Sequence, residues 1–432
     1  MKTFHQIGEA VDSRAQRRTL QVLVAAQALS GAGLAAGVTV GALLAQDMLD
    51  STGLAGLPSA LGTAGSALAA VVVARISHTR GRRPGLVTGY LVGALGSLGV
   101  VAAATLDLPL LLFSALAVYG AGTSTNLQAR YAGADLASPA HRARAVSTVL
   151  LATTAGAVIG PNLTQVTTGL ARRLHIPDLA GPFLVPAAAY AGAAAILAFW
   201  LRPDPLLLAR TRGDHVTTEP DSAATVAQAA RRAGLWTGVT VVVLAQMVMV
   251  AIMTMTPVHM SAHTHDAAAA GLAVSVHLGA MYLPSPVTGR LVDRYGRPAT
   301  AAASGVTLGG AAILAATAPS DSVTALTMAL ALLGLGWNLG LVAGTAMVTD
   351  AASLSTRATV QGRVDVGIAI AAAVGGLGSG AVVAAAGYPT LALGGGGLAL
   401  IIVAAATLEG HRARRAASGA HGQAGIGAHR VR

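Results

Sequence analysis

Apolar segments of about 20 residues recur along the whole chain and are separated by short polar stretches. An α-helix of roughly that length crosses the hydrocarbon core of a bilayer. The pattern predicts twelve spanning helices, at residues 20–45, 53–76, 85–105, 108–129, 145–169, 183–201, 236–258, 270–289, 299–318, 322–348, 364–385 and 388–407. We therefore expect an all-α membrane protein that crosses the bilayer twelve times.

The longest polar interruption divides the chain into two halves. Its prolines and acidic residues favour turns and loops over a continuous helix. We predict an N-terminal six-helix bundle at 1–201, a cytoplasmic linker at 202–235 and a C-terminal six-helix bundle at 236–407. Residues 408–432 are rich in Arg, His and Gly, which predicts a disordered basic tail.

An internal repeat supports this division. When residues 74–83 are laid over residues 289–298, the same shift places Asp135 on Asp350 and Arg142 on Arg357. Such repeats are typical of transporters built from two similar halves. The repeat favours a pseudo-symmetric 6+6 arrangement of the twelve helices.

The composition excludes a soluble domain, because 54% of the residues are hydrophobic and only 10% are charged. The net charge of +11 does not indicate a nucleic-acid partner, because the basic residues are spread over short loops. The chain has no cysteine and so no disulfide. We expect the lipid bilayer and a small solute or metal ion as partners, and a monomeric protein.

The basic residues also predict the orientation. Lys and Arg that flank spanning helices stay on the cytoplasmic side. With the N-terminus inside, every Lys and Arg except Arg172 and Arg173 falls on that side. We expect a multi-pass protein of the cytoplasmic (inner) membrane with both termini in the cytoplasm.

One loop carries a recognisable motif. Residues 289–298 read GRLVDRYGRP and lie between the eighth and ninth predicted helices. The segment resembles the Gly-x-Leu-x-Asp-Arg-x-Gly-Arg-Arg signature of the major facilitator superfamily, which occurs there and between helices 2 and 3. The resemblance implies the major facilitator fold and transport by alternating access of the two bundles. It also implies a gating role for Gly289, Asp293, Arg294, Gly296 and Arg297.

The first copy of this motif, residues 74–83, departs from the pattern. Arg75 and Gly81 match the second copy, whereas His78 stands where the superfamily usually has aspartate. The resemblance assigns the first copy to the same gate. The sequence leaves open whether this copy can close the gate without the carboxylate.

Methionine and histidine gather in one window, residues 247–281. Met249 and Met253 are four residues apart on the seventh predicted helix, and His277 and Met281 are four apart on the eighth, so each pair shares a helical face. Thioethers combined with an imidazole select Cu(I) over hard cations. Core packing of the methionines and a hydrogen-bonded histidine are the alternative interpretation.

The two pairs resemble the motifs on helices 7 and 8 of the CcoA-like branch of the superfamily, which are bacterial copper importers. The resemblance implies that the four residues bind copper along the transport path, with copper as the transported ion and no tightly bound cofactor. The adjoining loop, which we expect to face outward, adds possible entrance ligands: His259, Met260, His263 and His265.

Two rival functions stay open. Residues 156–161 resemble the glycine-proline motif of drug:proton antiporters, which implies proton-coupled efflux of a small organic compound. Such a pump needs a carboxylate in the membrane. The predicted helices 1–6 carry none, but Asp365 on the eleventh is a candidate for proton coupling, unless it pairs with Arg363 or reaches the interface. The other rival is a non-transporting metal sensor.

An enzyme is not expected. No combination of a nucleophile, a base and an orienting group is visible in the sequence.

Overall fold

A computed structural model describes residues 2–34, 44, 48, 57–162, 164–213, 222–263, 267–319 and 321–429 of the chain. Wherever the predicted spans fall within these ranges, the chain is almost entirely helical. By length and composition, eight described helical stretches are suited to cross a membrane. The 12-helix, 6+6 layout predicted from the sequence fits the observed arrangement.

The N-terminal half, called the N-half below, runs from α1 to α8. Its elements are α1 (Lys2–Gly31), α3 (Leu57–Arg80), α4 (Arg82–Thr105), α5 (Pro109–Ala134), α6 (Arg142–Asn162), α7 (Thr164–Arg173), the 3-10 helix η1 (Asp178–Phe183) and α8 (Leu184–Trp200). Parts of the first two predicted spans, residues 35–43, 45 and 53–56, lie outside the described residues.

The C-terminal half, called the C-half, runs from α10 to α15. Its elements are α10 (Ser222–Ala262), α11 (Ala267–Tyr282), α12 (Ser285–Tyr295), α13 (Arg297–Thr317), α14 (Val323–Ala351) and α15 (Arg357–His429). A short helix, α9 (Pro205–Gly213), lies between the two halves in sequence.

Proline and glycine explain where the helices break and turn. The eighth predicted span divides into α11 and α12 at Pro284, which precedes the first residue of α12. Spans eleven and twelve are continuous in α15 except at Gly387, whose φ of 83° is readily adopted only by glycine. The predicted boundary between spans eleven and twelve therefore lies where the chain turns.

Helical structure also extends into two segments that were predicted to lack it. α10 begins at Ser222, inside the predicted linker, and α15 continues to His429, through most of the predicted disordered tail. Both extensions are rich in alanine, and the second also carries several arginines, residues with high helix propensity. Residues 214–221 of the linker and 430–432 of the tail lie outside the described residues.

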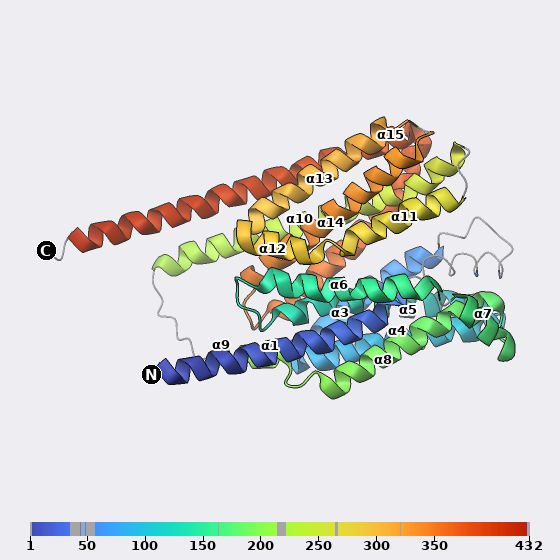
Figure 1. Ribbon diagram of the computed structural model, residues 1–432, viewed down its shortest axis with the longest axis horizontal. Helices are drawn as coiled ribbons and strands as arrows, with labels where there is room; N and C mark the ends of the chain where they lie inside the picture. The colour runs from blue at the N-terminus through green and yellow to red at the C-terminus, as the bar shows by residue number, and fades with distance from the viewer. Residues whose placement is uncertain are drawn as a thin grey trace.

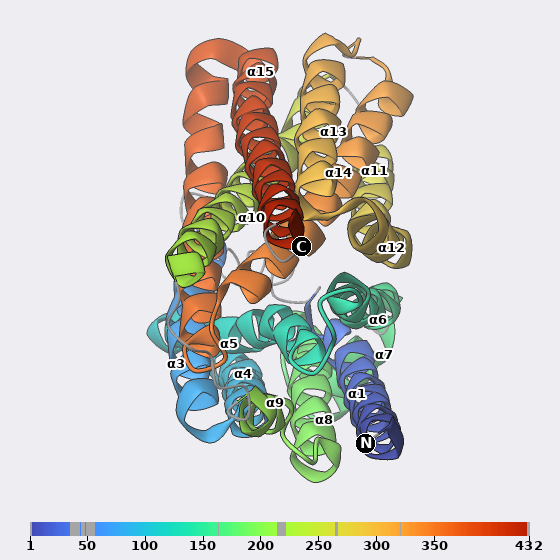
Figure 2. The same ribbon diagram turned by 90° about the vertical axis from the view of Figure 1, so that its left-hand side faces the viewer.

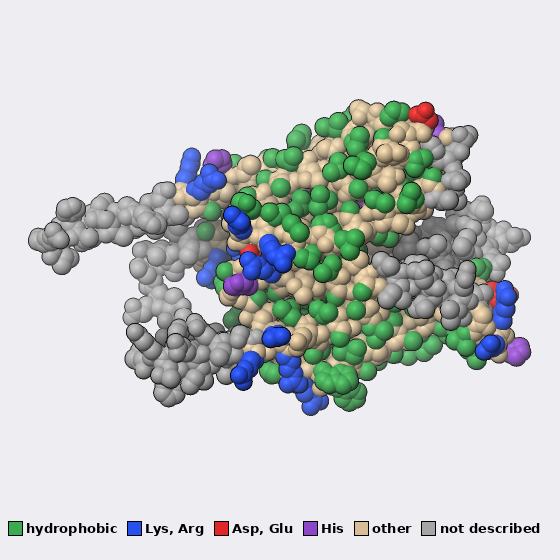
Figure 3. Space-filling model, in the orientation of Figure 1, with side chains coloured by type: hydrophobic (Ala, Val, Ile, Leu, Met, Phe, Trp, Pro, Cys, Tyr) green, Lys and Arg blue, Asp and Glu red, His purple; other side chains and the backbone are tan. Residues whose placement is uncertain are grey.

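The two halves form separate bundles that pack along one face (Figures 1 and 2). Figure 2 looks from the end that carries both termini and shows α10–α15 above the helices of the N-half. We call this the basic end, because the arginines of the loops between α3 and α4, α5 and α6, and α12 and α13 gather there (Figure 3). The opposite end carries α7 (Figure 1), against which η1 packs.

Small residues bring the helices of the N-half into close contact. A Cβ atom on Gly65 of α3 would lie only 1.8 Å from the carbonyl oxygen of Ala117 on α5. On α6, a Cβ on Gly156 would lie 2.2 Å from the carbonyl oxygen of Ala28. Contacts of this kind stabilise membrane helix bundles, where lipid supplies little hydrophobic driving force. Close packing of α6 on α1 therefore explains why residue 156 is a glycine, and this explanation does not require an antiport function.

Candidate functional site

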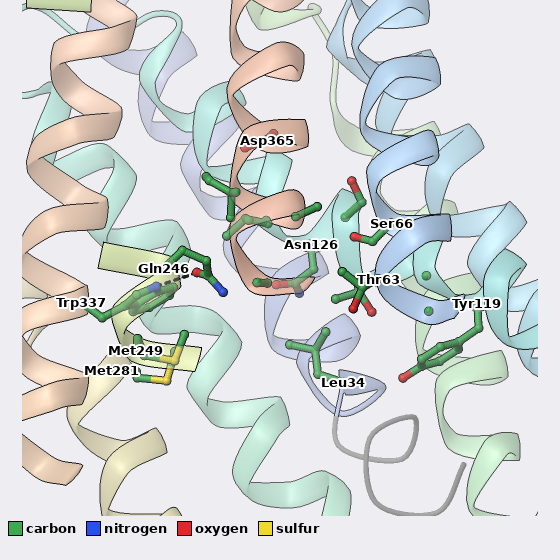
Figure 4. A pocket seen from close by; sticks show the side chains of 18 of the residues that line it. Leu34, Thr63, Ser66, Tyr119, Asn126, Gln246, Met249, Met281, Trp337 and Asp365 are labelled. Carbon is green, nitrogen blue, oxygen red and sulfur yellow. Dashed lines mark hydrogen bonds between the residues drawn. The ribbon is translucent and has the colours of Figure 1, made fainter. Parts of the chain in front are cut away.

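A cavity of about 310 Å³ lies between the two halves. Its walls differ in chemistry (Figure 4). The N-half contributes mainly hydroxyl and amide side chains, and the C-half contributes thioether, aromatic and amide side chains. The lining includes Thr63, Ser66 and Asn126 from the N-half and Gln246, Met249, Met281 and Trp337 from the C-half.

An aromatic pair forms part of the C-half wall. The rings of Trp337 and Tyr282 meet edge to face, with centroids 5.8 Å apart. The Trp337 Nε1 donates a hydrogen bond of 2.8 Å to Gln246 Oε1. This bond connects α14 to α10 and holds the indole in place, so the wall offers a fixed aromatic surface to a solute.

A buried ion pair lies at one side of the cavity. Asp365 of α15 accepts through Oδ1 from Arg130 Nη2 at 2.8 Å and from the Tyr131 hydroxyl at 3.1 Å. Asp365 is 4% exposed and Arg130 is fully buried. Because these residues come from different halves, the ion pair joins the two bundles. Among the described residues, Asp365 Oδ2 has no hydrogen-bond partner.

This geometry corrects two expectations from the sequence. Asp365 pairs with Arg130, not with Arg363. Arg130 was treated as a loop cation because the predicted helix ended at residue 129, but α5 continues to Ala134 and takes Arg130 inside the protein. The charge of Arg130 was the signal in the sequence that could have revealed this pair. An arginine that directly follows an apolar span needs a buried partner if the helix continues past its predicted end.

The predicted copper ligands lie close to the cavity but do not all face it. Met249 and Met281 line the same wall (Figure 4) and are 4% and 5% exposed. Met253 packs against the C-half core. His277 is fully buried, with Nδ1 2.8 Å from the Leu330 carbonyl oxygen, and its Nε2 has no partner among the described residues. A metal site formed by all four residues stays a prediction.

The predicted entrance loop is largely helical. α10 continues to Ala262, so His259 and Met260 lie on the helix. The His259 ring stacks on Tyr388 at 4.4 Å and also contacts the His263 ring, while Met260 is fully buried in the C-half core. His265 lies outside the described residues. Packing therefore accounts for Met260 and for the position of His259.

The basic end is held closed by two similar ion clusters. In the first, Asp135 accepts from Arg82 Nε of its own half at 2.7 Å, and Arg357 of the C-half lies 3.7 Å away. Arg82 also donates across the interface to Gln361. Asp135 and Arg82 are almost fully buried, so these contacts fill the space between the bundles.

The second cluster repeats the first with the halves exchanged. Asp350 pairs with Arg297 of its own half at 2.7 Å and with Arg142 of the N-half. Arg297 donates as well to the carbonyl of Pro139 in the N-half. The pairing of Asp350 and Asp135 in the sequence repeat therefore corresponds to two equivalent contacts in space.

The GRLVDRYGRP loop adds a further contact. Both Asp293 oxygens lie 3.3 Å from backbone nitrogens, those of Ala143 and Arg144 at the start of α6, where a carboxylate favours the free N–H groups and the helix dipole. Arg144 also forms an ion pair with Asp293. Gly289 permits this approach, since a Cβ there would lie 2.6 Å from Ser147 Oγ.

The other residues of this motif have smaller parts. Gly296 has a φ of 91° and makes the turn between α12 and α13. The Arg294 guanidinium lies over the Tyr295 ring, 5.5 Å from its centroid. The motif thus combines one turn, one close approach and one helix-capping carboxylate.

In the first motif copy, which lacks the aspartate, residues of the linker make the contacts with the loop. Arg210 of α9 donates to the His78 carbonyl at 2.8 Å and to the carbonyls of Leu354 and Ser355 in the C-half, both at 3.1 Å. Asp204, also from the linker, accepts from the Arg83 backbone N–H at 2.7 Å.

The remaining residues of this copy differ in their part. Gly81, with φ 98°, packs against Asp204, whereas Arg75 is exposed. The contacts that join the two halves at His78 are therefore made by backbone carbonyls and a linker arginine, Arg210.

Comparisons with known proteins agree with this architecture. The family model of the Major Facilitator Superfamily matches residues 23–266 and 238–429, which together cover most of the chain and both halves. The chain belongs to the major facilitator superfamily. It is a multi-pass transporter and not an enzyme.

Two relatives and one solved structure illustrate the family. The uncharacterized MFS-type transporter YdeG of Bacillus subtilis is 53% identical over 390 residues, 90% of each chain. The riboflavin transporter RfnT of Brucella anthropi is 32% identical over 358 residues, 82% of this chain and 86% of RfnT. The human organic anion transporter MFSD10 (TETRAN) superposes with a TM-score of 0.71 at 16% identity, covering 90% of this transporter and 99% of that chain, which shows a common fold.

Weakening the ion clusters at the basic end should open the transporter to a measurable extent. Replacing Asp350 by Asn removes the charge shared by Arg142 and Arg297, whose side chains are 13% and 24% exposed. We expect the closed state to lose about 1 kcal/mol, roughly a fivefold change in the ratio of closed to open molecules. Since the chain has no cysteine, spin labels at Ala140→Cys and Ser353→Cys can report the distance across the basic end.

In this labelled protein, Asp350→Asn should increase the population with long label-to-label distances. The exposed Asp321, near the opposite end of the molecule, provides the matched control Asp321→Asn. An unchanged distance distribution in Asp350→Asn would show that the cluster does not hold the gate.

Proposed function

We propose that the protein is a secondary active transporter that moves a small organic solute together with a proton by alternating access. In this proposal the protein lies in the inner membrane with the basic end in the cytoplasm, in accordance with the distribution of Lys and Arg. The observation that carries the proposal is the buried Asp365–Arg130 pair, which borders the cavity and joins the two halves.

The cavity favours an organic solute. A volume of about 310 Å³ is at the small end of the range for pockets that bind small molecules. Its lining of aromatic, amide and hydroxyl groups also matches that class of ligand, in which apolar contacts supply affinity and a few polar groups fix orientation. The relative RfnT is named a riboflavin transporter, so riboflavin is the first solute to test.

Asp365 supplies a means of coupling. Its Oδ2 can take up a proton that enters through the cavity, which neutralises the carboxylate and weakens its attraction to Arg130. The two halves then lose one contact close to the closed basic end. Proton and solute leave together when that end opens, so both move toward the cytoplasm.

The test is uptake of riboflavin by purified protein in proteoliposomes. An inwardly directed proton gradient should drive saturable accumulation, and a protonophore should abolish it. Uptake that ignores the pH gradient would contradict proton coupling. Absence of any saturable uptake would exclude riboflavin as the solute.

Copper import is the second candidate, and it rests on Met249 and Met281, whose thioethers line one wall of the cavity. The two thioethers suit Cu(I), and His277, one helical turn before Met281, has an Nε2 without a partner among the described residues. If copper is transported, Met281→Leu should reduce copper uptake into vesicles about tenfold or more, because it removes one soft ligand of a site with few ligands.

Met328, an exposed methionine on α14, provides the control Met328→Leu for this experiment. Equal copper uptake by wild type, Met281→Leu and protein-free vesicles would eliminate the copper hypothesis. It would leave the organic-solute proposal unaffected.

A further inference from the structure

Two amide side chains in the cavity have orientations that their partners determine. The first is Gln246. The indole N–H of Trp337 can only donate, so the atom that it meets at 2.8 Å must be the Gln246 oxygen. The amide nitrogen of Gln246 is thereby directed away from Trp337 and into the cavity, as Figure 4 shows.

The second is Asn126, whose orientation follows from a chain of hydrogen bonds in the N-half. Gln27 Nε2 donates to the Asn126 backbone carbonyl at 3.0 Å. A carbonyl only accepts, so the Gln27 amide cannot be flipped, and its Oε1 accepts from the Tyr90 hydroxyl. The single hydrogen of Tyr90 is then used, so its oxygen accepts from the Ser30 hydroxyl at 3.0 Å.

The last hydrogen bond of this series involves the Asn126 side chain. With its hydrogen donated to Tyr90, the Ser30 oxygen is left as an acceptor for Asn126 Nδ2 at 2.9 Å. Asn126 therefore offers Oδ1, an acceptor, to the cavity that it lines. Gln27, Ser30 and Tyr90 are fully buried, and reversing the bond between Ser30 and Asn126 would leave the Ser30 and Tyr90 oxygens 3.0 Å apart with no hydrogen between them.

We propose that the cavity selects a planar heteroaromatic solute with an imide or lactam edge. The N–H of that edge donates to Asn126 Oδ1, and the neighbouring carbonyl accepts from Gln246 Nε2. The ring lies against the Trp337 and Tyr282 pair. This inference rests on the proposed function, organic-solute transport, and narrows the class of solute for that cavity.

The same arrangement also disfavours certain solutes. A carboxylate at the same position would place its negative oxygen against Asn126 Oδ1, so ring carboxylates are disfavoured. An N-methylated imide loses the donor and leaves Asn126 Oδ1 unpaired. The site thus discriminates by the hydrogen on one ring nitrogen, a distinction that a purely apolar pocket makes poorly.

Binding of two flavin rings tests the inference. Lumiflavin has an imide edge, and its N3-methyl derivative lacks the imide hydrogen. Titration of the purified full-length protein, followed by flavin fluorescence, should give lumiflavin an affinity about tenfold or more above that of the methylated ring. In the double variant Ser30→Ala/Tyr90→Phe, Asn126 Nδ2 loses both hydroxyl oxygens that can accept from it, and the amide is free to flip, so this ratio should fall to below about threefold.

Ser97 provides the matched control. It is another buried serine of the N-half, but its hydroxyl bonds to the Gly93 carbonyl of its own helix, so Ser97→Ala should keep the wild-type ratio. Should this double variant not fold, Asn126→Ala removes the acceptor Oδ1 itself and should lower lumiflavin affinity more than that of the methylated ring.

Equal binding of the two rings by wild type, no binding of either, or an unchanged ratio in Ser30→Ala/Tyr90→Phe would each overturn the inference. The readout is binding and needs no proton gradient. Gradient-driven uptake of another organic solute, accompanied by one of these results, would refute the solute class and leave the proposed function standing.

Discussion

Replacing Asp365 by Asn should abolish accumulation driven by a proton gradient while solute exchange across the membrane continues. Each pH unit supports about tenfold accumulation for each coupled proton, so a gradient of about two units gives up to roughly a hundredfold in wild type. The asparagine side chain of Asp365→Asn cannot take up a proton but has nearly the same shape as a protonated aspartic acid. The accumulation ratio should therefore fall to about one.

The measurement compares gradient-driven uptake with counterflow in the same proteoliposomes, loaded with riboflavin or with whichever solute the transport assay identifies. Asp178, whose side chain is 48% exposed and pairs with Arg172 at the opposite end of the molecule, provides the control Asp178→Asn. This control should accumulate solute like wild type. Accumulation that persists in Asp365→Asn would assign the coupling proton to another group.

The all-α fold and its layout of two six-helix halves could be predicted from the sequence because apolar spans depend on local properties. Lipid requires about 20 apolar residues for each span, whatever the neighbouring helices do. Helix ends were less predictable. Residues 222–235 and 408–429 are polar enough to resemble loops, yet their alanines continue the adjoining helices.

The gate was predictable in part. The sequence repeat alone paired Asp135 with Asp350 and Arg142 with Arg357. The structure joins each aspartate to the arginine of the other half. Arg210 was not foreseen as the partner of His78, because contacts between a linker and a loop have no periodicity that a sequence could reveal.

The cavity was the least predictable part. Met249 and Met281 were selected by spacing and do line it, whereas spacing also selected Met253 and His277, which pack among other side chains. The reverse holds for Arg130 and Asp365, which are 235 residues apart in sequence and meet only because the two bundles fold against each other. No single-helix pattern could pair them.

Replacing Arg130 by Met should be among the most destabilising single changes in this protein. Arg130 donates to Asp365, to the Tyr131 hydroxyl at 2.8 Å and to Thr345 Oγ1 at 3.2 Å, and it is fully buried. Removing one member of a buried ion pair leaves an uncompensated charge, at a cost of about 3–5 kcal/mol. Unfolding by SDS in mixed micelles measures this loss.

The double variant Arg130→Met/Asp365→Leu separates the pair from the packing around it. Because both charges are gone, it should recover most of the stability lost in Arg130→Met, although it cannot couple protons. Arg172→Met, which removes an exposed arginine, should unfold like wild type. If the double variant is no more stable than Arg130→Met, then the lost contacts of Arg130 with Thr345 and Tyr131 matter more than the stranded charge of Asp365, and the ion pair is not what holds the two halves together.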